Sequence, residues 1–131
     1  MSQVKYQRTI ATETSCTGVG LHTGVETTIT FKPAGEDFGI RFKRMDVEGC
    51  PEIKADIDHV VDISRGTTIE ENGVRIHTVE HALAACVGIG LDNVLIELTE
   101  KEPPVMDGSS IDFVEALLKA GIVKQNQPRN Y

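Results

Sequence analysis

Short stretches of alternating apolar and polar residues occur along much of the chain, a pattern typical of half-buried β-strands. Other stretches are rich in threonine and β-branched residues, whose side chains pack well on a pleated sheet. Asn72-Gly73 accepts positive φ at both positions and is a strong signal for a tight hairpin turn. The sequence therefore predicts strands within residues 5–11, 26–31, 39–44, 53–61, 67–76 and 93–98.

The first stretch with helical spacing of apolar residues is 79–87, and the glycines that follow it are suited to ending a helix. Thr78 is the expected N-cap, because its hydroxyl can accept a hydrogen bond from the first free N–H groups. Glu80 then lies in the first turn, where the helix dipole favours a carboxylate. This predicts a helix that begins just after Thr78.

A second helix is predicted near the end of the chain. Ser109 or Ser110 is its expected cap, Phe113 and Leu117 mark its apolar face, and Gly121 ends it. Most strands precede the helices, which favours an α+β fold. We expect a two-layer sandwich in which two helices pack on one face of a mixed or antiparallel sheet, with a small β-hairpin insert. Residues 1–123 form this domain, and the polar segment 124–131 is interpreted as a linker.

Composition narrows the classes of function. The chain has 131 residues, of which 40% are hydrophobic, and a net charge of −7, which argues against nucleic acid as a partner. No apolar run reaches the roughly 18–20 residues of a membrane span, and residues 1–10 lack the apolar core of a signal peptide. A cytoplasmic protein is therefore expected. Cys16, Cys50 and Cys86 form no close pair, which disfavours disulfides or a thiolate metal site.

The segment His77-Thr-Val-Glu-His81 contains residue types that bind zinc and activate water. In one interpretation both histidines bind zinc from one helical face, as in an inverted zincin peptidase. The strand-like residues before His77 and the expected cap at Thr78 place His77 outside the helix, which disfavours that interpretation. In the other, His77 is an exposed residue and His81 a structural one near a helix start. The local pattern leaves both a metal role and a structural role open.

Three other segments have candidate functions. Residues 17–24 contain three glycines and a loop histidine, His22, and read most simply as a turn between strands. Residues 102–109 stiffen the chain with two prolines and turn it at Asp107, which is a possible metal ligand. Residues 62–68 form a polar loop with Arg65, a residue type that can bind phosphate, although a surface role is the simpler interpretation.

Together these segments resemble one family, the UDP-3-O-acyl-N-acetylglucosamine deacetylases. The resemblance is carried by Thr-Gly-Val-Gly-Leu-His-Thr-Gly at 17–24, Thr-Val-Glu-His at 78–81, Leu-Asp-Asn at 91–93 and Glu-Pro-Pro-Val-Met-Asp-Gly-Ser at 102–109. They occur in the order and spacing of the family and span nearly the whole chain. The resemblance implies a zinc-dependent hydrolase of lipid A biosynthesis in the cytoplasm of a Gram-negative bacterium, acting on a UDP-sugar lipid precursor.

The resemblance also implies roles for individual residues. His81 is the zinc ligand and Glu80 the general base on the attacking water. Leu21 and His22 match positions that border the active site, and Ile63 and Ser64 match a loop beside it. His77 falls where the family tolerates other residue types.

Members of the family have two domains of similar architecture, packed through their helices, with zinc (Zn2+) between them. The other two ligands are a His and an Asp from a His-x-x-x-Asp motif of the second domain, and this sequence lacks that motif. We therefore expect an N-terminal domain that is inactive in isolation, binds zinc weakly and associates with itself through an uncovered helical face. The alternative is a non-catalytic binding or partner module that retains this fold.

Overall fold

The structure is a computed structural model that describes residues 4–64, 66–106 and 110–129. Its largest element is a five-stranded sheet with the strand order β2-β3-β9-β4-β5. Only the β4–β9 pair is parallel, so the sheet is mixed. The strands of this sheet are β2 (Thr14–Val19), β3 (Glu26–Pro33), β9 (Val94–Leu98), β4 (Ile40–Arg44) and β5 (Glu52–Lys54).

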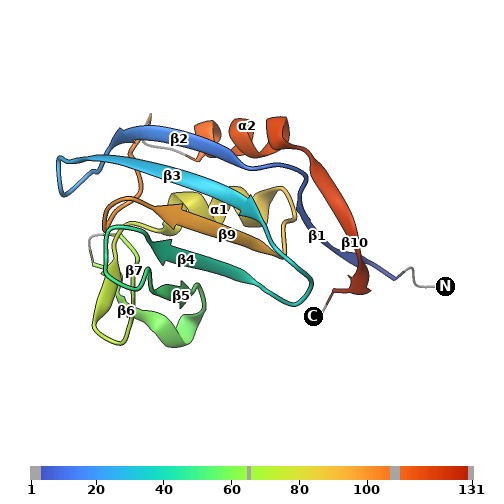
Figure 1. Cartoon of the computed structure of the whole chain (residues 1–131), viewed down its shortest axis with the longest axis horizontal. Helices are drawn as coiled ribbons and strands as arrows, with labels where there is room; N and C mark the ends of the chain where they lie inside the picture. Colours follow the sequence, from blue (N-terminus) through green and yellow to red (C-terminus); the bar gives the residue numbers. More distant parts are fainter. Residues whose placement is uncertain (1–3, 65, 107–109, 130–131) are drawn as a thin grey trace.

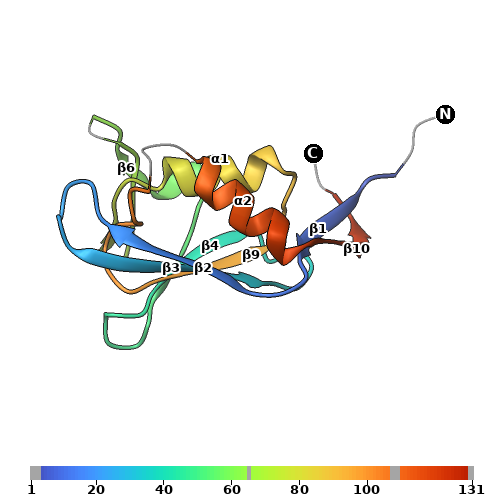
Figure 2. The same ribbon diagram turned by 90° about the horizontal axis from the view of Figure 1, so that it is seen from above.

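Two helices, α1 (Glu80–Gly88) and α2 (Ile111–Ala120), lie side by side on one face of this sheet (Figures 1 and 2). The inward side chains of the strands and helices form one buried core. The Phe31 ring on β3 meets the Phe113 ring on α2 edge to face, with ring centroids 5.9 Å apart. The expected α+β sandwich is confirmed. None of the helices in the described part of the chain is long and apolar enough to cross a membrane.

A small three-stranded sheet, which we call the insert, carries the predicted hairpin. It consists of β6 (Val60–Asp62), β7 (Thr68–Glu71) and β8 (Val74–Ile76), preceded by the 3-10 turn η1 (Ile57–His59). Asn72 and Gly73 have φ values of 52° and 80°, as the predicted tight turn requires. The His59 imidazole contacts Asp56 at 2.7 Å and Glu71 at 2.6 Å, which ties η1 to β7. The single strand expected over 53–61 is thus divided between two sheets.

The two ends of the described chain pair with each other. β1 (Tyr6–Ile10) and β10 (Ile122–Pro128) form an antiparallel ribbon at the end of the molecule opposite the insert (Figure 1). Residues 124–128, interpreted from their polarity as part of a linker, therefore belong to a strand. Whether the segment also leads to a second domain stays a prediction.

Two further details differ from the sequence-based expectation. β2 was not expected, because its alternation is carried by serine and threonine instead of large apolar residues. Its hydroxyls pair across the strands, Ser15 with Thr30 at 2.8 Å and Thr17 with Thr28 at 2.9 Å. Ser110 occupies the N-cap position of α2 without a side-chain capping bond, and Ser109 lies outside the described residues.

Candidate functional site

The chain enters α1 in an unusual backbone conformation. Thr78 has a φ of 57°, which is rare for a β-branched residue because its Cβ crowds the backbone. The N-cap of α1 is Val79, so the prediction that Thr78 caps the helix is wrong. The Thr78 hydroxyl instead donates to a carboxylate oxygen of Glu102 at 2.6 Å. This side-chain bond fixes the segment immediately before the first helical turn.

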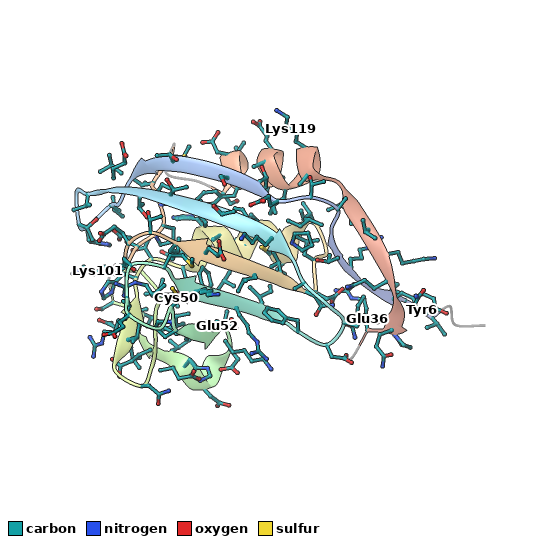
Figure 3. All side chains as sticks on the ribbon, viewed as in Figure 1. Tyr6, Glu36, Cys50, Glu52, Lys101 and Lys119 are labelled. Carbon is teal, nitrogen blue, oxygen red and sulfur yellow. The ribbon has the colours of Figure 1, made fainter. Side chains whose placement is uncertain are left out.

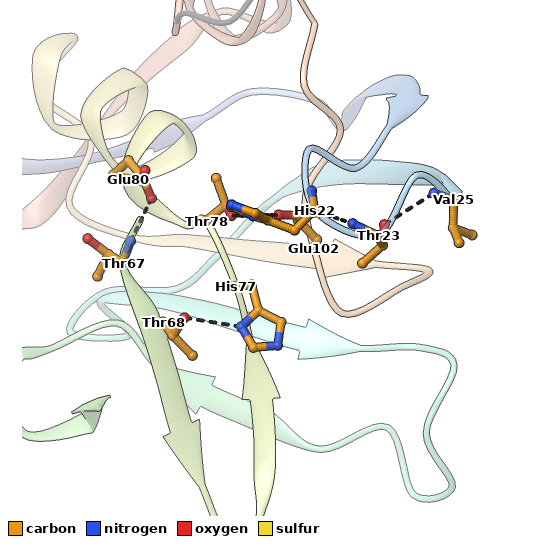
Figure 4. Close-up of polar contacts among 9 residues, drawn as sticks. All are labelled: His22, Thr23, Val25, Thr67, Thr68, His77, Thr78, Glu80 and Glu102. Atoms are coloured by element: carbon orange, nitrogen blue, oxygen red, sulfur yellow. Dashed lines mark hydrogen bonds and ion pairs between the residues drawn. The ribbon is translucent and has the colours of Figure 1, made fainter. Parts of the chain in front are cut away.

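Glu80 begins α1, as expected, and the insert holds its carboxylate. Oε1 of Glu80 accepts a hydrogen bond from the backbone N–H of Thr67 at 2.9 Å (Figure 4). Oε2 faces Gly66, where an added Cβ would lie only 3.0 Å from it. Gly66 also has a φ of 99°, which disfavours any other residue. The carboxylate is therefore oriented by one backbone donor, and Gly66 beside Oε2 contributes no side chain that would cover this oxygen.

His81 follows Glu80 in the first turn of α1 and is partly exposed. Its neutral imidazole is chemically suited to be one zinc ligand. Within the described residues no group of three or more His, Cys, Asp or Glu side chains is placed to hold a metal ion. The described part of the chain thus supplies the His81 imidazole one residue after the Glu80 carboxylate, in the first turn of α1. A metal bound here requires further ligands.

His77 follows the end of β8 and does not belong to α1. This excludes the inverted zincin arrangement, which needs His77 and His81 four residues apart on one helix. Its Nδ1 lies 3.1 Å from the hydroxyl of Thr68. Burial, together with the charge of Lys101, lowers the pKa of His77. The side chain is consequently a neutral hydrogen-bonding group at neutral pH.

Glu102 lies at the centre of the polar contacts around this site, with 0% of its surface exposed. Its Oε1 accepts the backbone N–H groups of His22 at 2.9 Å and Thr23 at 3.1 Å. Its Oε2 accepts the Thr78 hydroxyl at 2.6 Å and lies 2.8 Å from Nδ1 of His22 (Figure 4). Burial alone raises the pKa of Glu102, but these hydrogen bonds outweigh it, and the pKa is lowered below 4.5. The buried carboxylate is therefore ionised at neutral pH.

A pocket of about 520 Å³ opens beside these residues. It lies between the insert and residues 20–25, the turn between β2 and β3 that we call the glycine loop. Lys101, which lines the pocket, is at the end of the molecule opposite Tyr6 (Figure 3). Gly66, which faces the Glu80 carboxylate, forms part of the wall. The pocket is lined by His22, Thr23, Val25, Asp62, Gly66, Thr68, His77, Glu100 and Lys101.

The four residues expected to contact substrate lie on two loops. Leu21 and His22 lie in the turn after β2, where Leu21 is 57% exposed. Ile63 is 75% exposed, and Ser64 beside it bonds to Asp62 through both its N–H and its hydroxyl. Of the four, His22 lines the pocket. Arg65 and Asp107 lie outside the described residues.

The three cysteines are free, as the sequence indicated. Cys86 is buried on the inner face of α1, and burial raises the pKa of its thiol to about 12. Such a thiol stays protonated and is a poor nucleophile or metal ligand.

Glu102 is a component of the site that the sequence did not predict. In the sequence, the segment 102–109 has two prolines, a turn with the possible metal ligand Asp107 and a resemblance to the family, but nothing in it shows that Glu102 is buried among hydrogen-bond donors. The one available signal is the glycine loop. A Cβ at Gly20 would lie 2.6 Å from Oε1 of Glu102 and 2.4 Å from Oγ1 of Thr23. The loop is thus glycine-rich in part because a carboxylate approaches its backbone.

Gly20→Ala is expected to lower the free energy of unfolding by about 1–3 kcal/mol, the usual cost of forcing a group into a filled site. The reason is the close approach of Glu102 and Thr23. Urea unfolding of the wild-type and variant chains measures the effect. Gly35→Ala is the matched control, because a Cβ there meets nothing within 4 Å. Equal stability of the two variants would contradict the close approach at Gly20.

Known proteins resemble this chain over nearly its whole length. Residues 7–131 match the family model described as UDP-3-O-acyl N-acetylglycosamine deacetylase. The chain is 59% identical over 126 residues to a protein of Chlorobaculum tepidum named "Bifunctional enzyme LpxC/FabZ", covering 96% of this chain and 27% of that protein. Proteins named UDP-3-O-acyl-N-acetylglucosamine deacetylase from Saccharophagus degradans and Xanthomonas oryzae are 46% and 44% identical. Each alignment covers 95% of this chain and 41% of the relative, so the chain spans less than half the length of these relatives.

Proposed function

Because the chain belongs to the UDP-3-O-acyl N-acetylglycosamine deacetylase family, we propose that it forms one half of the active site of a zinc amidohydrolase. The substrate is UDP-3-O-acyl-N-acetylglucosamine, and water cleaves its N-acetyl group to give acetate and a free amine for lipid A biosynthesis. The observation that carries the proposal is the orientation of Glu80, beside His81 and against Gly66 of the pocket wall. Since the substrate is a nucleotide-activated sugar, we place the reaction in the cytoplasm.

His81 would hold the zinc ion, together with a histidine and an aspartate from a second domain. When bound, zinc supplies Lewis-acid polarisation of the amide carbonyl and of water. Glu80 acts as the general base and accepts a proton from the attacking water at the oxygen that faces Gly66. The Thr67 N–H holds the other oxygen, so the base needs no reorientation during the reaction.

Leu21, His22, Ile63 and Ser64 are the proposed substrate contacts on this domain. They lie on the turn after β2 and the loop after β6, and both loops supply walls of the pocket beside Glu80. We propose that the sugar enters between these loops. The reacting amide would then lie near the start of α1.

Joining this chain to the remainder of the Chlorobaculum tepidum relative tests the function. We expect the joined protein to release acetate from UDP-3-O-acyl-N-acetylglucosamine, because the two halves of the site are then complete. The 131-residue chain alone should show no turnover and should hold zinc weakly, since three protein ligands are typical of a catalytic zinc site. Acetate release and zinc content after gel filtration are the measurements.

The intact Chlorobaculum tepidum protein is the control for assay conditions. A folded but inactive joined protein would contradict the deacetylase proposal and favour the alternative of a non-catalytic partner module. Stoichiometric, tightly held zinc in the isolated chain would contradict a site shared between two domains.

The outer surface of the helical layer is the proposed contact with the second domain. Val87 on α1 and Leu118 on α2 are 67% and 55% exposed, which is costly for large apolar side chains in contact with water. We expect the isolated chain to self-associate through this face in sedimentation experiments. Val87→Ser with Leu118→Ser should shift it toward monomer, whereas Val19→Ser on β2 should not. A monomeric wild-type chain at high concentration would contradict this.

A further inference from the structure

We infer that Glu102 is a positioning residue that holds the His22 imidazole in its Nδ1–H tautomer and thereby presents Nε2 to the pocket as a hydrogen-bond acceptor. The tautomer follows from the geometry around Glu102. The use of Nε2 to accept a hydrogen bond from an O–H or N–H group of the sugar rests on the proposed function.

The first step is the direction of the bond between the two side chains. Nδ1 of His22 lies 2.8 Å from Oε2 of Glu102. An ionised carboxylate can only accept, so Nδ1 must carry the proton. The Glu102 carboxylate accepts two backbone N–H groups and the Thr78 hydroxyl besides, a donor set that stabilises its charged form.

The Thr78 hydroxyl supports the same assignment of the proton to Nδ1 of His22. Its proton points to Oε2 of Glu102, at the short distance of 2.6 Å. Its oxygen lone pairs therefore remain free to accept, and Nδ1 of His22 lies 3.2 Å from that oxygen. A single Nδ1–H placed between Glu102 and Thr78 satisfies both contacts, whereas an unprotonated Nδ1 would face two acceptors.

The second step concerns the other ring nitrogen of His22, Nε2. Nδ1 faces a fully buried carboxylate, while the side chain of His22 is 42% exposed and lines the pocket. Nε2 lies on the far side of the five-membered ring from the bond to Glu102. In the neutral imidazole with Nδ1 protonated, Nε2 carries the lone pair. His22 thus offers the pocket an acceptor whose orientation is fixed by its own backbone N–H and side chain together.

The third step is a link between the two sides of the site. Glu102 binds the glycine loop through His22 and Thr23, and it binds the strained entry of α1 through Thr78. Glu80 follows Thr78 by two residues. One buried carboxylate therefore sets the position of His22 relative to the helix that carries the proposed base.

The direct test is nitrogen-15 NMR of the ring nitrogens in the labelled 131-residue chain, at alkaline pH where imidazoles are neutral. We expect His22 to show a protonated Nδ1 and an unprotonated Nε2. His59, His77 and His81 in the same spectrum serve as internal references. A His22 with its proton on Nε2 in the folded wild-type chain would overturn the inference, and this test needs no variant.

Glu102→Gln provides the second test. The carboxamide oxygen can keep the two backbone N–H bonds, and its NH2 group then donates toward Nδ1, which must become the acceptor. We expect His22 to switch to the Nε2–H tautomer. Glu97→Gln on β9, where Glu97 pairs with Lys32 away from the site, should leave the tautomer unchanged. Thr78→Ser, which keeps the hydroxyl, should also leave it unchanged. A folded Glu102→Gln chain that retains the Nδ1–H tautomer would overturn the role of Glu102.

In the joined protein, Glu102→Gln should lower kcat/KM at least tenfold, while Glu97→Gln leaves it unchanged. Unaltered kcat/KM despite a switched tautomer would overturn the positioning role. If the joined protein without substitutions is inactive, that result contradicts the proposed function but not the tautomer of His22. The tautomer is measured by NMR and does not depend on turnover.

Discussion

Glu80→Gln in the joined protein is expected to lower kcat by about 10²–10⁴-fold, the range that general-base catalysis typically contributes. Glutamine has nearly the same shape, and its carbonyl oxygen can still accept the Thr67 N–H. The substitution therefore removes proton acceptance and little else. Zinc content and the free energy of unfolding should stay close to those of the parent.

Glu97→Gln is the matched control, because it makes the same change from carboxylate to carboxamide at a position outside the site. Glu97 pairs with Lys32 on the face of the sheet that the helices do not cover. Steady-state rates of acetate release measure both variants. An active Glu80→Gln enzyme with normal zinc content would contradict the assignment of Glu80 as the base. Loss of zinc in the variant would instead assign it a ligand role.

Glu102→Ala is expected to be the most destabilising polar substitution in the site, by about 3–5 kcal/mol, because several donors lose their acceptor at once. The change deprives the backbone N–H groups of His22 and Thr23, and the Thr78 hydroxyl, of their acceptor. The bond from Thr78 is buried and the two backbone bonds are partly buried, and an unpaired buried donor costs about 1–3 kcal/mol. Urea unfolding at pH 7 measures the loss, and Glu97→Ala is the control.

The same carboxylate predicts how stability depends on pH. Folding lowers the pKa of Glu102 from 4.5, so its contribution is fully present above that value. The contribution is lost as the pH falls through the lower pKa of the folded state. The wild-type chain should therefore lose stability in acid more steeply than Glu102→Gln. Parallel acid profiles for the two chains would contradict the lowered pKa.

The parts of the fold that could be predicted depend on local pattern. The turn at Asn72-Gly73, the alternation in β4 and the apolar spacing of α1 each reflect interactions within a few residues. β10 was missed because its polar residues carry no strand periodicity. That strand exists because β1, which is distant in sequence, provides its hydrogen-bond partners.

The residues of the site also divide into those that a local motif identifies and those that depend on distant contacts. Glu80 and His81 were identified from a short motif, together with its resemblance to a family. Glu102 and Thr78 were missed because their roles depend on contacts over 80 and 24 residues of sequence. Thr78 was taken for a helix cap since threonine is favoured there, but a buried carboxylate competes successfully for its hydroxyl. Apart from the glycine at position 20, these long-range polar contacts leave no trace in local composition.

The anchoring of Glu80 by Thr67 limits how this protein can change over evolution. Thr67 ends the loop after β6 and directly precedes β7, whose Ile69 is buried opposite Ile76. Deleting or inserting one residue between Thr67 and Ile69 would force a choice: the strand keeps its register and the carboxylate loses its donor, or the donor stays and Ile69 turns to the opposite face. The residue type at position 67 can therefore vary, because the donor is a backbone N–H, but its spacing from Ile69 is constrained. Conserved spacing without a conserved residue is the expected signature of this position.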